Sequence, residues 1–141
     1  MFQYIRKAQY HETDQMGVIH HANYVKWMEE ARVAFMDDLG MGYERMEADG
    51  LVSPVVGIEL DYRKPVRFSD EVEVRVFVRS HAGVRMEIGY EFYNRTAGTL
   101  CATGSSRHCF LKDGRIVSLK KLLPEFAAAL AAASREDGAA P

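Results

Sequence analysis

Apolar residues recur at every third or fourth position between residues 24 and 39, which predicts one long amphipathic helix. One face of this helix carries Tyr24, Met28, Ala31, Phe35 and Leu39. The remainder is mostly polar and consists of Lys26, Glu29, Glu30, Arg32, Asp37 and Asp38. Gly40 or Gly42 is a natural stop, because glycine accepts the left-handed conformation at a helix end. We therefore expect about 18 residues of helix, roughly 27 Å long, beginning near His21 to Tyr24.

Most of the remaining chain alternates apolar and polar residues, the period-two pattern of half-buried strands. Such segments cover residues 56–62, 72–78, 84–92 and about 99–111, and Phe2, Tyr4 and Tyr10 suggest an opening strand. Glycine-containing turns at 81–83, 94–98 and 112–115 predict hairpins between the later strands. A second helix is expected from Pro124, with Phe126, Ala127, Leu130 and Ala131 on one side.

This order of elements predicts an α+β domain in which a long helix lies along a twisted antiparallel sheet. A chain of 141 residues with 48% hydrophobic residues suits one domain with its own core. We expect that single domain to cover residues 1–134. Residues 135–141 offer little to bury and are expected to be a disordered tail.

Charge and composition narrow the classes of partner and compartment. A net charge of −2 gives no sign of a nucleic-acid or membrane partner. The runs Arg63-Lys64 and Lys120-Lys121 are candidates for phosphate contacts, although solvated surface charge is the simpler interpretation. Without a secretory signal or a membrane-spanning apolar run, a cytoplasmic protein is expected. Cys101 and Cys109 share one predicted strand, about 26 Å apart, so both should be reduced.

Asp14 is the strongest candidate for chemistry, because it stands shortly before the predicted start of the long helix. A carboxylate near a helix N-terminus lies beside free backbone N–H groups that can polarise a carbonyl. This pairing indicates acyl-transfer chemistry. On its own, an aspartate here would more often simply cap a turn, since Asp-x-x-Gly is common in loops.

For the other polar and aromatic residues around Asp14 and in the predicted helix, structural roles are expected. His11, Glu12, His20 and His21 could suggest a metal site, but adjacent histidines seldom point at one ion and no further ligand has convincing spacing. We expect neither a metal nor another cofactor. Glu29 and Glu30 should be exposed or paired at an interface, and Tyr24 and Trp27 should form core or pocket wall.

The run YHETDQMGVIHHANY at residues 10–24, followed by WMEEAR at 27–32, resembles the signature of the hotdog-fold acyl-CoA thioesterases. Within them it is similar to the 4-hydroxybenzoyl-CoA thioesterase branch, which includes the short-chain acyl-CoA thioesterases of Tol-Pal gene clusters. A weaker likeness extends through residues 61–71 and Leu123-Pro124. The resemblance implies a hotdog fold, with a long central helix wrapped by a curved antiparallel sheet of five or six strands.

The resemblance also assigns residues to the site. The catalytic carboxylate of the family falls on Asp14, and its oxyanion-binding backbone amide falls on His21. The implied substrate-binding residues are Gly17, Val18, Asn23, Tyr24 and Arg85. Arg85 stands in the turn that often holds the phosphates of CoA, although most basic residues of that turn are missing here. The family's active sites usually form between subunits, so a homodimer or a dimer of dimers is expected, and unpaired sheet edges favour it.

Several alternatives remain open from the sequence alone. A thiol has a pKa of about 8.5, so it departs as thiolate without a dedicated general acid. Asp14 could then act as nucleophile or as general base. The thioester could be carried by CoA or by an acyl carrier protein. A hotdog dehydratase or hydratase using His21 with Asp14, and a non-catalytic acyl-CoA-binding protein, are the other candidate functions.

Overall fold

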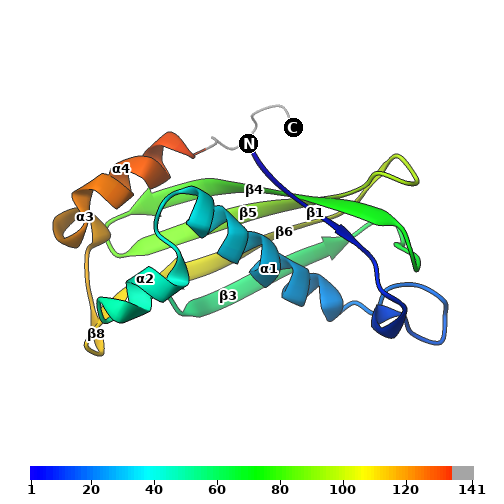
Figure 1. Ribbon diagram of the computed structural model, residues 1–141, viewed down its shortest axis with the longest axis horizontal. Coiled ribbons are helices and arrows are strands. Elements are labelled where there is room, and N and C mark those ends of the chain that lie inside the picture. The colour runs from blue at the N-terminus through cyan, green and yellow to red at the C-terminus, as the bar shows by residue number, and fades with distance from the viewer. Residues whose placement is uncertain (135–141) are drawn as a thin grey trace.

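A long helix, α1 (Asn23–Asp38), lies along one face of a five-stranded antiparallel sheet in the computed structural model, which describes residues 1–134 (Figure 1). The strands are β1 (Phe2–Lys7), β3 (Val55–Tyr62), β4 (Glu71–Ala82), β5 (Arg85–Asn94) and β6 (Thr99–Cys109). Their order across the sheet is β1-β4-β5-β6-β3, with every neighbouring pair antiparallel. The predicted α+β architecture is confirmed. The proposed tail, residues 135–141, lies outside the described residues.

Shorter elements surround this main sheet. They are a 3-10 helix η1 (Tyr10–Glu12), α2 (Tyr43–Ala48), β2 (Leu51–Val52), β7 (Leu111–Lys112), β8 (Arg115–Ile116), α3 (Leu119–Leu122) and α4 (Pro124–Ala132). The prediction of one strand as far as Leu111 was wrong. The main-sheet strand ends at Cys109, and after the buried Phe110 the chain joins a second sheet of order β2-β7-β8. The helix predicted from Pro124 is confirmed, although its Ala131 is exposed.

The core lies between α1 and the inner face of the sheet. Alternate valines of β4 and the apolar face of α1 are almost fully buried, as their spacing predicts: Val72, Val74, Val76, Val78, Trp27, Met28, Ala31 and Phe35. Gly40, with a φ of 83°, follows the end of the helix. Burying each of these valine, methionine and phenylalanine side chains stabilises the fold by about 1.5–3 kcal/mol.

Arg32 departs from the predicted polar face of the helix. It is only 6% exposed. Its Nε donates to the Tyr43 hydroxyl at 2.9 Å, and its Nη1 donates to the Tyr90 hydroxyl at 3.1 Å. Tyr43 belongs to α2, a six-residue helix too short to produce a clear periodic pattern in the sequence. The amphipathic pattern of α1 alone therefore could not show that this side chain is covered.

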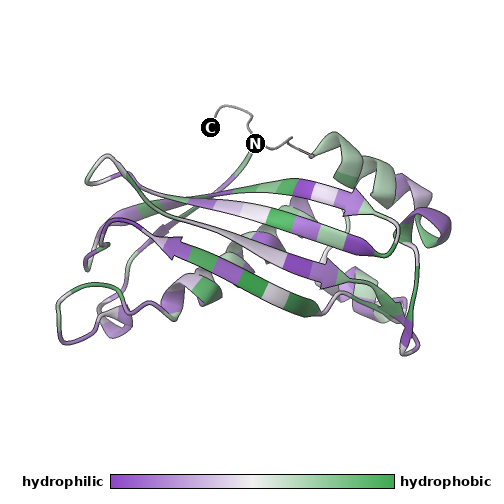
Figure 2. Cartoon of the chain, turned by 180° about the vertical axis from the view of Figure 1, so that it is seen from behind, coloured by the Kyte–Doolittle hydropathy of each residue, from purple (hydrophilic) through white to green (hydrophobic). Residues whose placement is uncertain are grey.

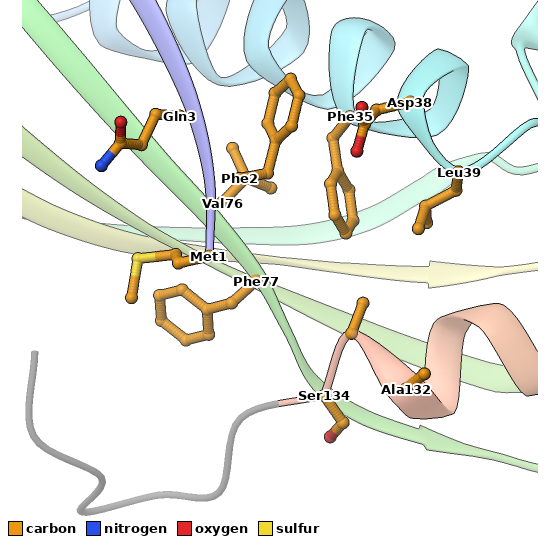
Figure 3. Close-up of a pocket in the computed structure, with 11 residues that line it drawn as sticks. Met1, Phe2, Gln3, Phe35, Asp38, Leu39, Val76, Phe77, Ala132 and Ser134 are labelled. Atoms are coloured by element: carbon orange, nitrogen blue, oxygen red, sulfur yellow. The ribbon is translucent and has the colours of Figure 1, made fainter.

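A cavity of about 660 Å³ lies where β1, the end of α1 and the end of α4 meet (Figure 3). Phe2, Phe35 and Val76 line it together with Phe77. Asp38 is its one ionisable side chain among residues 1–134. This cavity contains neither Asp14 nor His21, the two residues that the sequence assigns to the chemistry.

The last strand of the main sheet, β3, exposes much of its apolar surface. It pairs only with β6 in the described chain, so its other edge is open. Figure 2 shows this strand from behind, with hydrophobic and hydrophilic segments alternating along it. Val55, Val56, Ile58 and Tyr62 are between 37% and 62% exposed. The predicted strand is thus confirmed, while its apolar face has no cover within the single chain.

Two further observations concern residues 1–134. Cys101 is buried and Cys109 half-buried, and neither is disulfide-bonded, in agreement with their predicted separation along β6. No helix among residues 1–134 is both long enough and apolar enough to cross a membrane.

Candidate active site

The loop between η1 and α1 forms a short, closed hairpin that carries Asp14. Thr13 and Ile19 form an antiparallel bridge, and the Asp14 N–H donates to the Val18 carbonyl at 2.9 Å. Gly17 supports the tight turn with a φ of 79°, which glycine adopts at little cost. The returning arm is tied to the body by Ile19, whose N–H donates to the Val66 carbonyl at 2.8 Å.

The Asp14 side chain is half-buried at the start of this hairpin. Its Oδ1 accepts a hydrogen bond from the Met16 N–H at 2.8 Å, which is the contact expected of an aspartate that caps a turn. Its Oδ2 has no donor among residues 1–134 and is therefore available to a ligand or a water. Asp14 thus closes a turn and also presents a carboxylate oxygen.

The N-terminus of α1 leaves one backbone amide without an acceptor. The N–H groups of Asn23, Tyr24 and Val25 donate to carbonyls three residues earlier, at 3.0 to 3.3 Å. The Ala22 N–H donates to the Nδ1 atom of the His20 ring at 3.1 Å. The His21 N–H has no acceptor anywhere in the described part of the chain. An unpaired N–H at a helix N-terminus is a ready donor to a developing oxyanion.

Asp14 and His21 line the same cavity, which has a volume of about 270 Å³. Its walls also include Val18, Tyr24 and Tyr62. The hairpin loop, the first turn of α1 and the end of β3 line the cavity. These three segments lie at the end of the molecule where β1 leads into η1 (Figure 1). The residue that carries the free carboxylate oxygen and the residue that carries the unpaired amide therefore line one small cavity.

Tyr62, at the end of β3, holds the peptide group that follows His21. Its hydroxyl donates to the His21 carbonyl at 2.8 Å. Its ring stands edge-on to Tyr24, with ring centroids 5.0 Å apart. Burial raises the pKa of both tyrosines, so each stays a neutral phenol at physiological pH. Sequence reasoning placed Tyr62 in a strand but gave it no role at the site, because its partner lies 41 residues away.

The imidazole of His21 does not form a dyad with Asp14. It is exposed and stacks on the ring of His20, with centroids 4.2 Å apart. Among residues 1–134 no hydrogen bond joins this ring to the Asp14 carboxylate. The arrangement therefore favours a role for the His21 backbone over the side-chain acid–base pair that a dehydratase would need.

The remaining predicted site residues divide into two groups. Gly17, Val18, Asn23 and Tyr24 all lie in the hairpin or the first turn of α1, with Val18 and Tyr24 in the cavity wall. Arg85 lies at the opposite end of the sheet, where it pairs with Cys109 of β6. Tyr62 pairs with Ala102 of the same strand. Seven residues of strand separate the two positions by about 23 Å.

Two basic residues, Arg63 and Lys64, also line the cavity, together with Pro65. Arg63 forms an ion pair with Asp61, with Nε and Oδ2 3.3 Å apart, and both side chains are more than half exposed.

No cluster of three or more His, Cys, Asp or Glu residues suited to a metal ion occurs among residues 1–134.

Comparison with known proteins identifies the family. The model of the thioesterase-like superfamily matches residues 8–132. The chain belongs to this superfamily. Among curated relatives, the Bacillus subtilis (strain 168) protein YneP, provisionally named an acyl-CoA thioesterase, is 38% identical over 122 residues, which cover 85% of this chain and 88% of YneP.

Solved structures of the superfamily share the hotdog fold of this chain. A DHNA-CoA thioesterase from Staphylococcus aureus superposes with a TM-score of 0.86 at 32% identity, covering 92% of this chain and 88% of that protein. A gentisyl-coenzyme A thioesterase, at 21% identity and a TM-score of 0.82, agrees in fold over 92% of this chain and 99% of that protein. Acyl-CoA thioesterase activity is thus supported for the chain at the level of its family.

Proposed function

We propose that this protein hydrolyses an acyl-CoA thioester to a free acid and CoA, with Asp14 and the His21 backbone amide as its catalytic groups. One observation carries the proposal: Asp14 and His21 line one cavity, and the His21 backbone N–H has no acceptor in residues 1–134. The names of the relatives given above support the substrate class.

In the proposed reaction, the thioester carbonyl oxygen accepts a hydrogen bond from the His21 N–H. Negative charge on that oxygen is stabilised as the carbonyl carbon becomes tetrahedral, an effect typically worth about 3–4 kcal/mol per donor. Asp14 either attacks the carbonyl carbon to form a mixed anhydride, or removes a proton from an attacking water. In both routes the C–S bond breaks and the electron pair leaves with sulfur. In the general-base route the water oxygen becomes the second oxygen of the acid, whereas in the anhydride route water then cleaves an anhydride C–O bond, which releases the acid and regenerates Asp14.

Two catalytic groups are sufficient because the leaving group is undemanding. A thiol with a pKa of about 8.5 leaves as thiolate, so no general acid is needed beside the sulfur. A positioned carboxylate base alone contributes about 10²- to 10⁴-fold. The neutral tyrosines of the cavity, whose pKa values are raised by burial, serve as walls instead of proton donors.

We further propose that two copies of the chain associate through β3. An open strand edge offers unpaired N–H and C=O groups, and exposed side chains such as Val56, 62% exposed, and Ile58 add apolar surface. Since Tyr62 also belongs to β3, this association would lie directly beside the cavity. A homodimer or a dimer of dimers follows.

Membership of the 4-hydroxybenzoyl-CoA branch and the role of Arg85 stay predictions. The acyl group and the carrier are addressed by one experiment: a panel of short-chain, medium-chain, long-chain and aryl CoA thioesters, with matching acyl-carrier-protein thioesters, assayed by release of free thiol. Turnover of a CoA thioester that depends on Asp14 supports the proposal. Loss of enoyl absorbance from crotonyl-CoA without thiol release would identify a hydratase, and binding without turnover an acyl-CoA-binding protein.

A further inference from the structure

Glu12 is a buried carboxylate two residues before Asp14, at the end of η1. It is only 4% exposed. Glutamate is almost never buried to this extent unless it is paired, because an uncompensated charge is costly in the protein interior. In the sequence, Glu12 stands out only as a member of an unconvincing metal site. Its burial therefore calls for a structural reason.

Three donors from separate parts of the chain satisfy the Glu12 carboxylate. Oε1 accepts from Arg6 Nη1 of β1 and from the Gln9 N–H, both at 2.8 Å. Oε2 accepts from the indole Nε1 of Trp27, on α1, also at 2.8 Å. Burial alone raises the pKa of Glu12, but these three hydrogen bonds outweigh it and hold the pKa below its usual range. An ionised carboxylate therefore joins β1, η1 and α1.

The backbone of Glu12 fixes the two ends of the hairpin that carries Asp14. Its carbonyl accepts from the His20 N–H at 2.9 Å and from the Asn23 side-chain Nδ2 at 2.8 Å. The outgoing arm of the hairpin therefore starts at Glu12. The returning arm is hydrogen-bonded to Glu12 through the His20 N–H. Asp14 lies two residues after Glu12, and His21 lies one residue after His20.

We propose that Glu12 is a positioning residue, which sets the separation between the Asp14 carboxylate and the His21 amide by anchoring the hairpin to α1 and β1. The proposal rests on the catalytic roles suggested above for Asp14 and His21. Glu12 itself acts only through those two groups. Catalytic geometry is sensitive to such anchoring, since a displacement of about 1 Å can cost about 10²-fold in rate.

The test variant is Glu12→Gln, which keeps the side-chain shape. The Gln amide nitrogen cannot accept a hydrogen bond, so either Trp27 or the pair formed by Arg6 and Gln9 loses its acceptor. We expect kcat to fall at least about tenfold while KM changes less than about threefold, because the substrate-binding walls remain in place.

Glu30→Gln is the matched control, because it makes the same chemical change in the same network. The Glu30 Oε1 accepts from Arg6 Nε at 3.0 Å and from the Tyr4 hydroxyl at 2.9 Å, but within residues 1–134 it has no hydrogen bond to the hairpin. Its side chain is 39% exposed. If Glu12→Gln lowered kcat only by weakening this hydrogen-bond network in general, Glu30→Gln would lower kcat as well. We expect Glu30→Gln to keep kcat within about twofold of the wild type.

The experiment measures kcat, KM and thermal unfolding for wild type, Glu12→Gln and Glu30→Gln with one CoA thioester that the wild type hydrolyses. A kcat loss confined to Glu12→Gln, in protein that is fully folded at the assay temperature, supports the proposal. Equal kcat values for Glu12→Gln and the wild type, or equal losses in the two variants, would overturn it.

Two more variants keep the test decisive. If Glu12→Gln does not fold, Trp27→Phe removes the donor to Oε2 alone, and a kcat within twofold of the wild type in that folded variant would overturn the proposal. In an Asp14→Asn background, Glu12→Gln should lower the residual kcat by less than twofold, because no catalytic carboxylate is left to misplace. If Glu12→Gln lowered kcat as much in this background as it does in the wild type, the proposal would be contradicted. A wild type that releases no thiol from any thioester refutes the proposed function itself.

Discussion

Tyr62→Phe tests whether the peptide group of His21 must be held in place for catalysis. The substitution removes one hydroxyl, which donates to the His21 carbonyl at 2.8 Å, and keeps the ring that stands edge-on to Tyr24. The carbonyl is not left unsatisfied, because the Tyr24 N–H still donates to it at 3.3 Å. The variant therefore removes an orienting contact without creating a buried unpaired group.

The magnitude follows from the strength of a single hydrogen bond. A neutral hydrogen bond contributes about 0.5–1.5 kcal/mol net. If that free energy is lost from the transition state, kcat falls about 2- to 12-fold. Tyr62 is 46% exposed, so the free energy of unfolding should change by less than about 0.5 kcal/mol. Activity should therefore fall more than stability.

The assay is thiol release at saturating substrate, together with urea unfolding of the same preparations. Tyr10→Phe is the control, because Tyr10 is 76% exposed and its hydroxyl has no hydrogen bond to residues 1–134. We expect wild-type kcat for the control. A Tyr62→Phe kcat within 1.5-fold of the wild type would refute the reasoning, and so would an equal loss in the control.

Three further outcomes are expected. Ile58→Lys on the open edge of β3 should convert the oligomer to a 16.0 kDa monomer in light scattering, and an unchanged mass would count against association through this strand. Burial, assisted by Arg32, lowers the pKa of His108 from 6.5 to about 4, so the folded state binds this proton more weakly than the unfolded chain. The contribution of neutral His108 to the free energy of unfolding is complete above pH 6.5 and falls as the pH drops towards 4, by about 2 kcal/mol between pH 7 and 5. In urea unfolding, the free energy of unfolding of His108→Gln should therefore depend less on pH than that of the wild type. Turnover should survive EDTA, because thiolate departure needs no Lewis acid, and a loss restored by one divalent ion would contradict this.

The main elements could be predicted because each buries one regular face. The valines of β4 alternate, and the buried residues of α1 recur every three or four positions, so local spacing was enough to define both. Arg32 could not be placed in this way. Its burial depends on α2, whose six residues carry too little pattern to predict a helix or its position.

The site was predictable only in part, for a related reason. Asp14, Val18, His21 and Tyr24 are close in sequence, and the structure brings them to one cavity. The contact of Tyr62 with the His21 carbonyl depends on the pairing of β3 with β6. The hydrogen bonds of the Glu12 carboxylate depend on Trp27 of α1, 15 residues later, and on Arg6 of β1. Such contacts arise from tertiary packing and leave no local signal.

The central claim is that Asp14 performs the chemistry, and the most direct test is the kcat of Asp14→Asn. The amide keeps the size of the side chain but is a poor nucleophile and a negligible base, so kcat should fall by at least about 10²-fold while the protein stays folded and binds substrate. Asp61→Asn, an exposed change on neighbouring β3, should retain wild-type kcat. An Asp14→Asn variant with more than about a tenth of wild-type kcat, a barrier change below about 1.4 kcal/mol, would contradict the account.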